Sequence, residues 1–207
     1  SHIHTRNGVV DDEAASEVEA FAKARRFLSY LPSSVHGLPP RSAARTSNAD
    51  QEKLRRAIPK NPRSVYKVRP IVETVVDDGS FMEIGRNWGK ALATGLARVD
   101  GYPVAVLASD PYHYGGAFDR ATTEKYIRMI DLAELFHLPV VNFVDVPGFR
   151  VGIEAEEEGV MRAGVRALTA LAQTTVPWCT FIIRKAFGVA GASHQHPDRY
   201  AFRYAWP

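Results

Sequence analysis

The alternation of apolar and polar positions begins with a helical pattern in the N-terminal part of the chain. Between residues 12 and 31, apolar side chains recur near helical spacing, and the charge changes from acidic to basic, which complements the helix dipole. We therefore expect a helix over residues 12–31 whose apolar face packs against another element. Residues 2–5, which precede it, have a strand-like pattern.

The middle of the chain, residues 32–69, has a different pattern, rich in proline, serine and arginine. It is expected to be a linker without a core of its own, apart from a short helix near residues 49–58. Between Arg41 and Arg69 there are nine basic residues and two acidic ones. Such a stretch either holds phosphates, including those of a nucleotide-like cofactor, or is a solvated connector, which we favour for most of these side chains.

From residue 70 onward, apolar strands alternate with amphipathic helices. Strands that are apolar on both faces and separated by helices are typical of parallel strands buried in an α/β fold. We therefore predict three segments, at 1–31, 32–69 and 70–207. The elements expected in the last segment are helices at 71–76, 122–136 and 156–173, strands at 81–84, 92–99, 103–108, 139–144 and 180–183, a turn at Asp100-Gly101 and a strand-like end near Tyr204.

Composition narrows the class of protein. The chain has 207 residues, of which 45% are hydrophobic and 24% charged, as in ordinary globular proteins. No apolar run approaches the about 20 residues of a membrane helix, and the polar start is unlike a secretion signal, so we expect a cytoplasmic protein without a membrane partner. The single cysteine, Cys179, lies in an apolar run and is expected to be a buried, inert thiol.

Several catalytic motifs are absent from the sequence. There is no phosphate-binding G-x-x-x-x-G-K-[S/T] loop, no G-x-S-x-G elbow and no G-x-G-x-x-G, and without interleaved aromatics in the basic stretch we expect no nucleic-acid partner. His194 and His196 are a possible metal pair but are more typical of a loop, so no metal is expected. The acidic run at residues 154–158 is more typical of a helix start than of a catalytic carboxylate pair.

Two strand-to-loop junctions remain as candidate sites, residues 144–149 and 184–191. In parallel α/β sheets, ligands collect beyond the carboxyl ends of the strands. Small residues there allow a ligand to approach the backbone, whose free N–H groups can hold an oxyanion. The same glycines are also compatible with tight turns alone, and the residues by themselves leave both interpretations open.

The ordered motifs of the chain resemble the carboxyltransferase (beta) subunit of biotin-dependent acyl-CoA carboxylases, the propionyl-CoA and methylcrotonoyl-CoA carboxylase type. Residues 70–207 resemble the C-terminal half of that subunit, and residues 1–31 the end of its N-terminal half. The matching motifs include Asp77-Asp78-Gly79-Ser80-Phe81-Met82-Glu83, Gly115-Gly116-Ala117-Phe118-Asp119, Glu124-Lys125, Asp145-Val146-Pro147-Gly148-Phe149, Arg184-Lys185-Ala186-Phe187-Gly188 and Ala205-Trp206-Pro207.

The resemblance implies a crotonase-like fold of repeated β-β-α units and a hexamer whose active sites lie between subunits. It implies transfer of a carboxylate from carboxybiotin, held on a separate carrier domain, to the α-carbon of an acyl-CoA. A biotin carboxylase and the biotin carboxyl carrier would be the partners, in the cytoplasm or, in a eukaryote, the mitochondrial matrix. A biotin-dependent decarboxylase and a non-catalytic assembly homologue remain alternatives. Since the acyl-CoA half of the family pattern is missing, we expect the chain to be inactive alone.

Site residues follow from the resemblance position by position. The family's oxyanion site for the biotin ureido group corresponds to the backbone of Val189 and Ala190, after Gly188. Valine replaces a family glycine, and its β-branched side chain is expected to crowd the ring or to forbid a positive φ. Ala192 occupies the position that tunes acyl size, which suggests an acyl group larger than acetyl. The other residues implied to contact substrate are Gly115, Gly116, Asp145, Pro147, Gly148 and Phe149.

Overall fold

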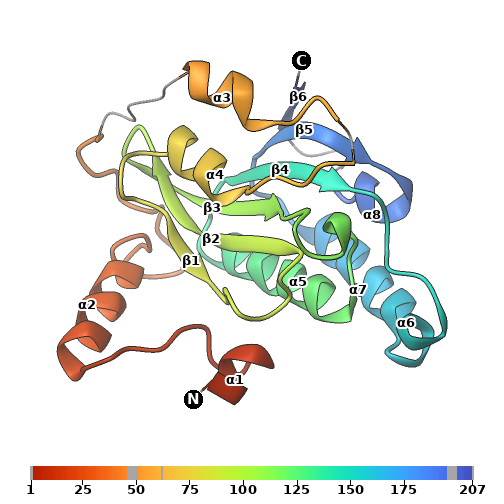
Figure 1. Cartoon of the computed structure of the whole chain (residues 1–207). Coiled ribbons are helices and arrows are strands. Elements are labelled where there is room, and N and C mark those ends of the chain that lie inside the picture. The colour runs from red at the N-terminus through yellow and green to blue at the C-terminus, as the bar shows by residue number, and fades with distance from the viewer. Residues whose placement is uncertain (1, 46–50, 62, 195–199, 207) are drawn as a thin grey trace.

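The computed structural model describes residues 2–45, 51–61, 63–194 and 200–206, which form a six-stranded mixed sheet with helices on both faces (Figure 1). The strands follow the order β1-β2-β3-β4-β5-β6; β1 to β3 are antiparallel, and β3 to β6 are parallel. The predicted α/β class and the parallel pairing of the apolar strands are therefore confirmed. The strands are β1 Met82–Ile84, β2 Leu92–Val99, β3 Tyr102–Ser109, β4 Val140–Val146, β5 Trp178–Ala186 and β6 Ala201–Ala205.

The central strands separate two hydrophobic cores. Along β3, Ala105 and Leu107 face α5 (Arg120–Leu135) and α7 (Val160–Gln173), whereas Val104 and Val106 face α4 (Arg69–Val75) on the other side of the sheet (Figure 1). Alternate residues of a strand point to opposite faces, so a strand with helices on both sides must be apolar throughout. This burial explains why the sequence predicted the central strands well.

The N-terminal part departs from its prediction. Residues 2–6 form a helix, α1 (His2–Arg6), where a strand was expected. The sheet ends at β1, so residues 2–6 do not pair with it. Their backbone groups are instead bonded locally, as the Asn7 N–H donating to Ile3 O shows. The next helix, α2, covers only Glu17–Leu28 because Ser16 caps it.

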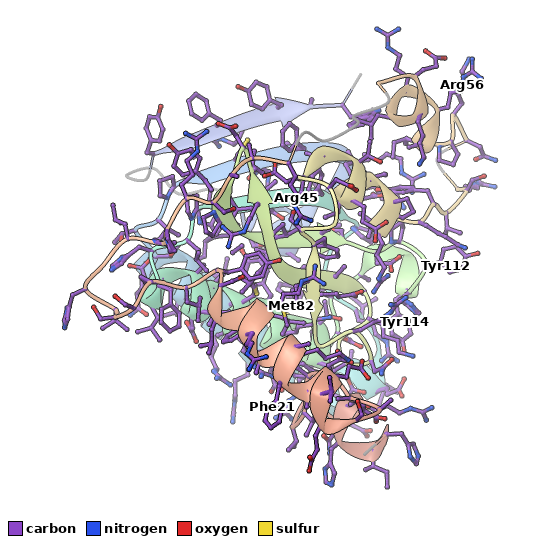
Figure 2. The ribbon with its side chains drawn as sticks, turned by 90° about the vertical axis from the view of Figure 1, so that its left-hand side faces the viewer. Phe21, Arg45, Arg56, Met82, Tyr112 and Tyr114 are labelled. Carbon is purple, nitrogen blue, oxygen red and sulfur yellow. The ribbon has the colours of Figure 1, made fainter. Side chains whose placement is uncertain are left out.

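The apolar face of α2 was expected to pack against another element, and within this chain that prediction is largely wrong. Val18, Phe21 and Leu28 are exposed, and only Phe27 packs against the core (Figure 2, in which α2 faces the viewer). The residues that follow α2, Tyr30 and Leu31, are buried and anchor the segment to the main body.

The helix expected over 156–173 is two helices, α6 (Ile153–Glu157) and α7, because Gly159 between them has a φ of +73°. Glu154 and Glu156 lie in the first turn of α6, as the acidic run predicted. No helix in the described parts of the chain is both long and apolar enough to span a membrane.

The proline-rich segment contributes to the core, although it was expected to be a bare linker. Tyr66 and Val68 are buried on the α4 side of the sheet. The short helix predicted there is α3 (Gln51–Ala57), and the expected residues 49 and 50 lie outside the described ranges. The division into three segments stays a prediction.

Candidate functional site

Three chain segments meet at the carboxyl ends of β3, β4 and β5. They are the loop after β3, which contains the 3-10 helix Tyr114–Gly116, the turn after β4 at residues 147–149, and α8 (Gly188–Ala192) after β5. Backbone hydrogen bonds join the segments: Phe118 N–H donates to Gly148 O at 3.1 Å, and Phe187 N–H donates to Val146 O at 3.0 Å. Both predicted strand-to-loop junctions are therefore brought to one edge of the sheet, as parallel pairing requires.

The loop after β3 contains two adjacent glycines whose positions differ in the space around them. Gly116 has a φ of +87°, and a Cβ there would overlap the carbonyl oxygen of Asp145, so its role is close backbone packing. Gly115 also has a positive φ, of +62°, but open space surrounds the position of its missing side chain. The exposed rings of Tyr112 and Tyr114 lie at this same edge of the molecule (Figure 2).

The turn after β4 combines an open backbone with an inward-facing ring. Gly148 has a φ of +131° and no atom near the position of a Cβ, and Pro147 beside it is half-buried. The ring of Phe149 packs against Gly164 of α7 and lies 6.5 Å, between centroids, from Phe118. Packing accounts for Phe149 here, and its implied contact with substrate stays a prediction.

The carboxylate of Asp145 is fully buried and faces other protein groups. Its Oδ2 accepts hydrogen bonds from Tyr66 Oη at 3.0 Å and from Arg184 Nε at 3.0 Å, and its Oδ1 accepts one from the backbone N–H of Lys185 at 3.2 Å. A buried carboxylate needs such partners because desolvation of its charge is costly. The sequence did not predict this network, because Tyr66 lies in the segment that was expected to be a linker.

Helix α8 places the two implied oxyanion donors at its first turn. The first N–H groups of a helix have no acceptor within it, so the backbone N–H groups of Val189 and Ala190 are free of α8's own hydrogen bonds, although Ala190 itself is buried. The positive φ of this segment, +61°, belongs to Gly188, and Val189 is helical with its side chain 53% exposed. Val189 therefore needs no positive φ in this structure, and the expected crowding of the ring by its side chain stays a prediction. Ala192 is exposed at the end of the same helix.

The other candidate groups fall outside this edge or lack a site. His194 lies in the turn after α8, as expected of a loop residue, but is buried, and His196 lies outside the described residues. Cys179 is partly buried, and burial raises the pKa of its thiol, consistent with an inert side chain. Among the residues that the structure describes, no three His, Cys, Asp or Glu side chains gather into a possible metal site.

A cavity of about 540 Å³ lies away from this site, between α2, β1 and α5. Its wall contains Lys125, whose Nζ donates to Trp88 O at 3.0 Å and to Leu92 O at 2.7 Å. Burial lowers the pKa of this amine to about 8. Nothing in the sequence distinguished Lys125 beyond its place in the Glu124-Lys125 motif.

Comparisons with known proteins agree with this architecture. The chain is 34% identical over 210 residues to the propionyl-CoA carboxylase beta chain of Roseobacter denitrificans. This alignment covers 99% of this chain and 41% of the relative. It is 34% identical over 208 residues to the biotin-dependent long chain acyl-coenzyme A carboxylase beta4 subunit of Mycobacterium tuberculosis, covering 97% of this chain and 39% of that subunit. The chain thus spans about two fifths of the length of these relatives.

Solved structures show the same similarity. The transcarboxylase 12S hexamer with hydrolyzed methylmalonyl-coenzyme A bound superposes with a TM-score of 0.93 at 30% identity, over 100% of this chain and 41% of that one. A single-chain, multi-domain long-chain acyl-CoA carboxylase superposes with a TM-score of 0.81 at 34% identity, over 92% of this chain and 19% of that one. The crotonase-like fold is thereby confirmed. A sequence model described as the carboxyl transferase domain matches residues 1–207, and the chain belongs to that family.

Proposed function

We propose that this chain forms the biotin-facing part of a carboxyltransferase that moves a carboxylate from carboxybiotin to the α-carbon of an acyl-CoA thioester. The observation that carries the proposal is the free pair of backbone donors at Val189 and Ala190, at the carboxyl edge of the sheet, in a chain of the carboxyl transferase family. Biotin, on its carrier, supplies an activated carboxylate. The donors of this chain would hold the ureido oxygen while negative charge develops there.

The backbone at this edge leaves room for a ligand. A Cβ at Gly115, Gly148 or Gly188 would meet no atom within 4 Å, so the backbone at these three positions borders open space. Backbone N–H groups suit an oxyanion because they are already oriented and need no change of protonation, and one such donor contributes about 3–4 kcal/mol to lowering a barrier. In this proposal Gly188, Val189 and Ala190 bind the ureido group, and Gly115, Gly116, Pro147, Gly148 and Ala192 border the substrates.

The proposal includes the assembly and the partners. Exposed apolar side chains lie around the site, including Val151 and Ile153 at 86% and 81% exposure and Phe187 at 60%, as a surface would be that a second copy covers. We place the chain in a homo-hexamer that works with a biotin carboxylase and a biotin carboxyl carrier in the cytoplasm, and light scattering of the full-length subunit measures its size.

The decisive experiment uses the full-length subunit that contains this chain, together with its carrier and biotin carboxylase. ATP- and bicarbonate-dependent carboxylation of acetyl-, propionyl- and longer acyl-CoAs is measured. Turnover on one of them supports the proposal and identifies the acyl group. No turnover on any of them, with the oligomer intact, contradicts it.

A second candidate is transfer or release of carboxylate from an acyl-CoA donor, as in a decarboxylase, which the similarity to transcarboxylase 12S favours. It predicts loss of carboxylate from methylmalonyl-CoA to free biotin without ATP, faster than the ATP-dependent reaction.

The non-catalytic alternative depends on Val189. Because Gly188 carries the positive φ, we expect Val189→Gly to change the rate of an active subunit less than about threefold. A Val189→Gly variant that gains activity from an inactive subunit would instead indicate that the natural protein has lost turnover.

A further inference from the structure

We propose that Asp145 is a positioning residue for α8: with Arg184 and Tyr66 it fixes the irregular end of β5 from which α8 begins, and so sets the direction of the Val189 and Ala190 donors. This inference rests on the proposed function and deepens it. It assigns Asp145 no contact with substrate, in contrast to the role implied by the family resemblance.

The first step is the irregular pairing of β4 with β5. The register is regular up to Val144 opposite Ile182, and the next pair is Val146 opposite Ala186. Three residues of β5, 183–185, therefore lie opposite one residue of β4, Asp145, and the regular pairing of the two strands is interrupted there by a bulge. Asp145 replaces the missing strand partner, because its Oδ1 accepts the backbone N–H of Lys185 at 3.2 Å.

The second step is the ion pair that holds this bulge. The guanidinium of Arg184 reaches Asp145 Oδ2 through Nε at 3.0 Å and Nη2 at 2.9 Å. The Arg184 side chain is 12% exposed, so the pair is shielded from water and its geometry is restricted.

The third step ties the proline-rich segment to the same point. Tyr66 Oη donates to Asp145 Oδ2 at 3.0 Å, and the Arg184 guanidinium lies 4.7 Å from the centre of the Tyr66 ring. Arg184 Nη1 also donates to Ser64 O at 2.8 Å. Residues 64–66 are thus clamped against the bulge, which stiffens it from the α4 side of the sheet.

The fourth step leads from the bulge to the donors. Lys185, held by Asp145, is separated from Val189 by three residues, and Phe187 N–H is fixed to Val146 O. Gly191 packs so closely on Ala186 that a Cβ would overlap its backbone. A displacement at Lys185 is therefore transmitted to α8. Misplacement of a catalytic group by about 1 Å lowers a rate by about 100-fold.

The test uses Asp145→Asn in the full-length subunit, with Glu134→Gln as the matched control. Glu134 also accepts a backbone N–H, from Thr175 at 2.7 Å, but at the opposite edge of the sheet, before β5 begins. Carboxyl transfer between an acyl-CoA and free biotin is measured with each substrate varied. For Asp145→Asn we expect kcat/KM for free biotin to fall by about 10- to 100-fold, while the KM for acyl-CoA changes less than about twofold. The control is expected to change neither by more than about twofold.

Hydrogen–deuterium exchange of residues 185–192 gives a readout independent of turnover. Faster exchange of this peptide in Asp145→Asn, but not in Glu134→Gln, supports the proposal. Unchanged exchange overturns it, as does an equal loss of activity in both variants that follows only the folded fraction. If the wild-type subunit transfers no carboxylate, the proposed function fails, and the exchange comparison still decides the positioning role.

Tyr66→Phe keeps the ion pair and removes one donor, so it tests the network even if Asp145→Asn does not fold. We expect a decrease of about two- to fivefold in kcat/KM for free biotin, again without a change in the KM for acyl-CoA. A decrease shared equally by both substrates would overturn the assignment.

Discussion

Asp145 and Glu134 are carboxylates that accept backbone N–H groups at opposite edges of the same sheet. Asp145, at the carboxyl edge, is fully buried and paired with Arg184. Glu134, at the amino edge, is half-buried and accepts from Thr174, Thr175 and Val176, and no described cation forms an ion pair with it. Water compensates part of the charge of Glu134, whereas Asp145 depends entirely on protein partners.

The difference shows how the two edges are used. At the amino edge a carboxylate closes the connection between α7 and β5, where the chain only needs to turn. At the carboxyl edge the charge holds a bulge, a segment of the proline-rich region and the start of α8 in one arrangement. A disturbance at the amino edge is therefore expected to remain local, and one at the carboxyl edge to spread to the candidate site.

The largest effect is expected from Arg184→Met, which leaves the Asp145 carboxylate buried without its cation. Breaking a buried pair from one side destabilises by about 3–5 kcal/mol. The free energy of unfolding from urea denaturation measures the loss. Asp145→Asn added to Arg184→Met should recover part of it, and a loss below about 1 kcal/mol for the single variant would mean that the two edges do not differ in this way.

A third buried charge, Lys125, provides a pH test. The folded protein loses the Lys125 proton near pH 8, whereas the unfolded chain holds it to about 10.5, so burial of the charged amine destabilises below pH 8 and this penalty disappears as the pH rises. The stability of the wild type relative to Lys125→Met should therefore increase between pH 8 and 10.5, by up to about 1.4 kcal/mol per pH unit. A constant difference between the two unfolding curves contradicts this assignment.

Within the carboxyl edge, the two neighbouring glycines should differ. Gly116→Ala must push a methyl group against the Asp145 carbonyl and also strain φ, so we expect a loss of about 2–3 kcal/mol. Gly115→Ala strains φ alone, with a loss of about 1 kcal/mol. Thermal unfolding of both variants ranks them, and equal losses would show that the contact with Asp145 is unimportant.

The smallest effect is expected from Glu134→Gln. Burial opposes ionisation, but hydrogen bonds from Thr175 and Thr174 outweigh it and lower the pKa of Glu134 below 4.5, so its ionised form stabilises the protein above that pH. The variant should lose about 1 kcal/mol at neutral pH, a difference that shrinks as the pH falls below 4.5. Unfolding at pH 7 and pH 4 measures it, and a difference that grows on acidification would reverse the sign.

The sequence predicted the buried sheet better than its surroundings. Strand β2, Leu92–Val99, has the predicted bounds, and its first six residues are buried. The predicted turn at Asp100-Gly101 is confirmed, and both residues have a positive φ. Helix α8 is too short to show a period, so the residues alone marked 184–191 only as a strand-to-loop junction, and the family resemblance pointed to Val189 and Ala190 within it. The Tyr66–Asp145 bond joins residues 79 positions apart, and no local pattern announces such a pair.

Gly188 has a consequence for the engineering of this protein. Because the unusual backbone angle is confined to Gly188, the exposed side chain at the next position is free of that constraint. A library of residues at 189 would vary the size and polarity of the rim while the two amide donors keep their directions. Substitutions at this one position could then change which acceptor molecules the protein uses.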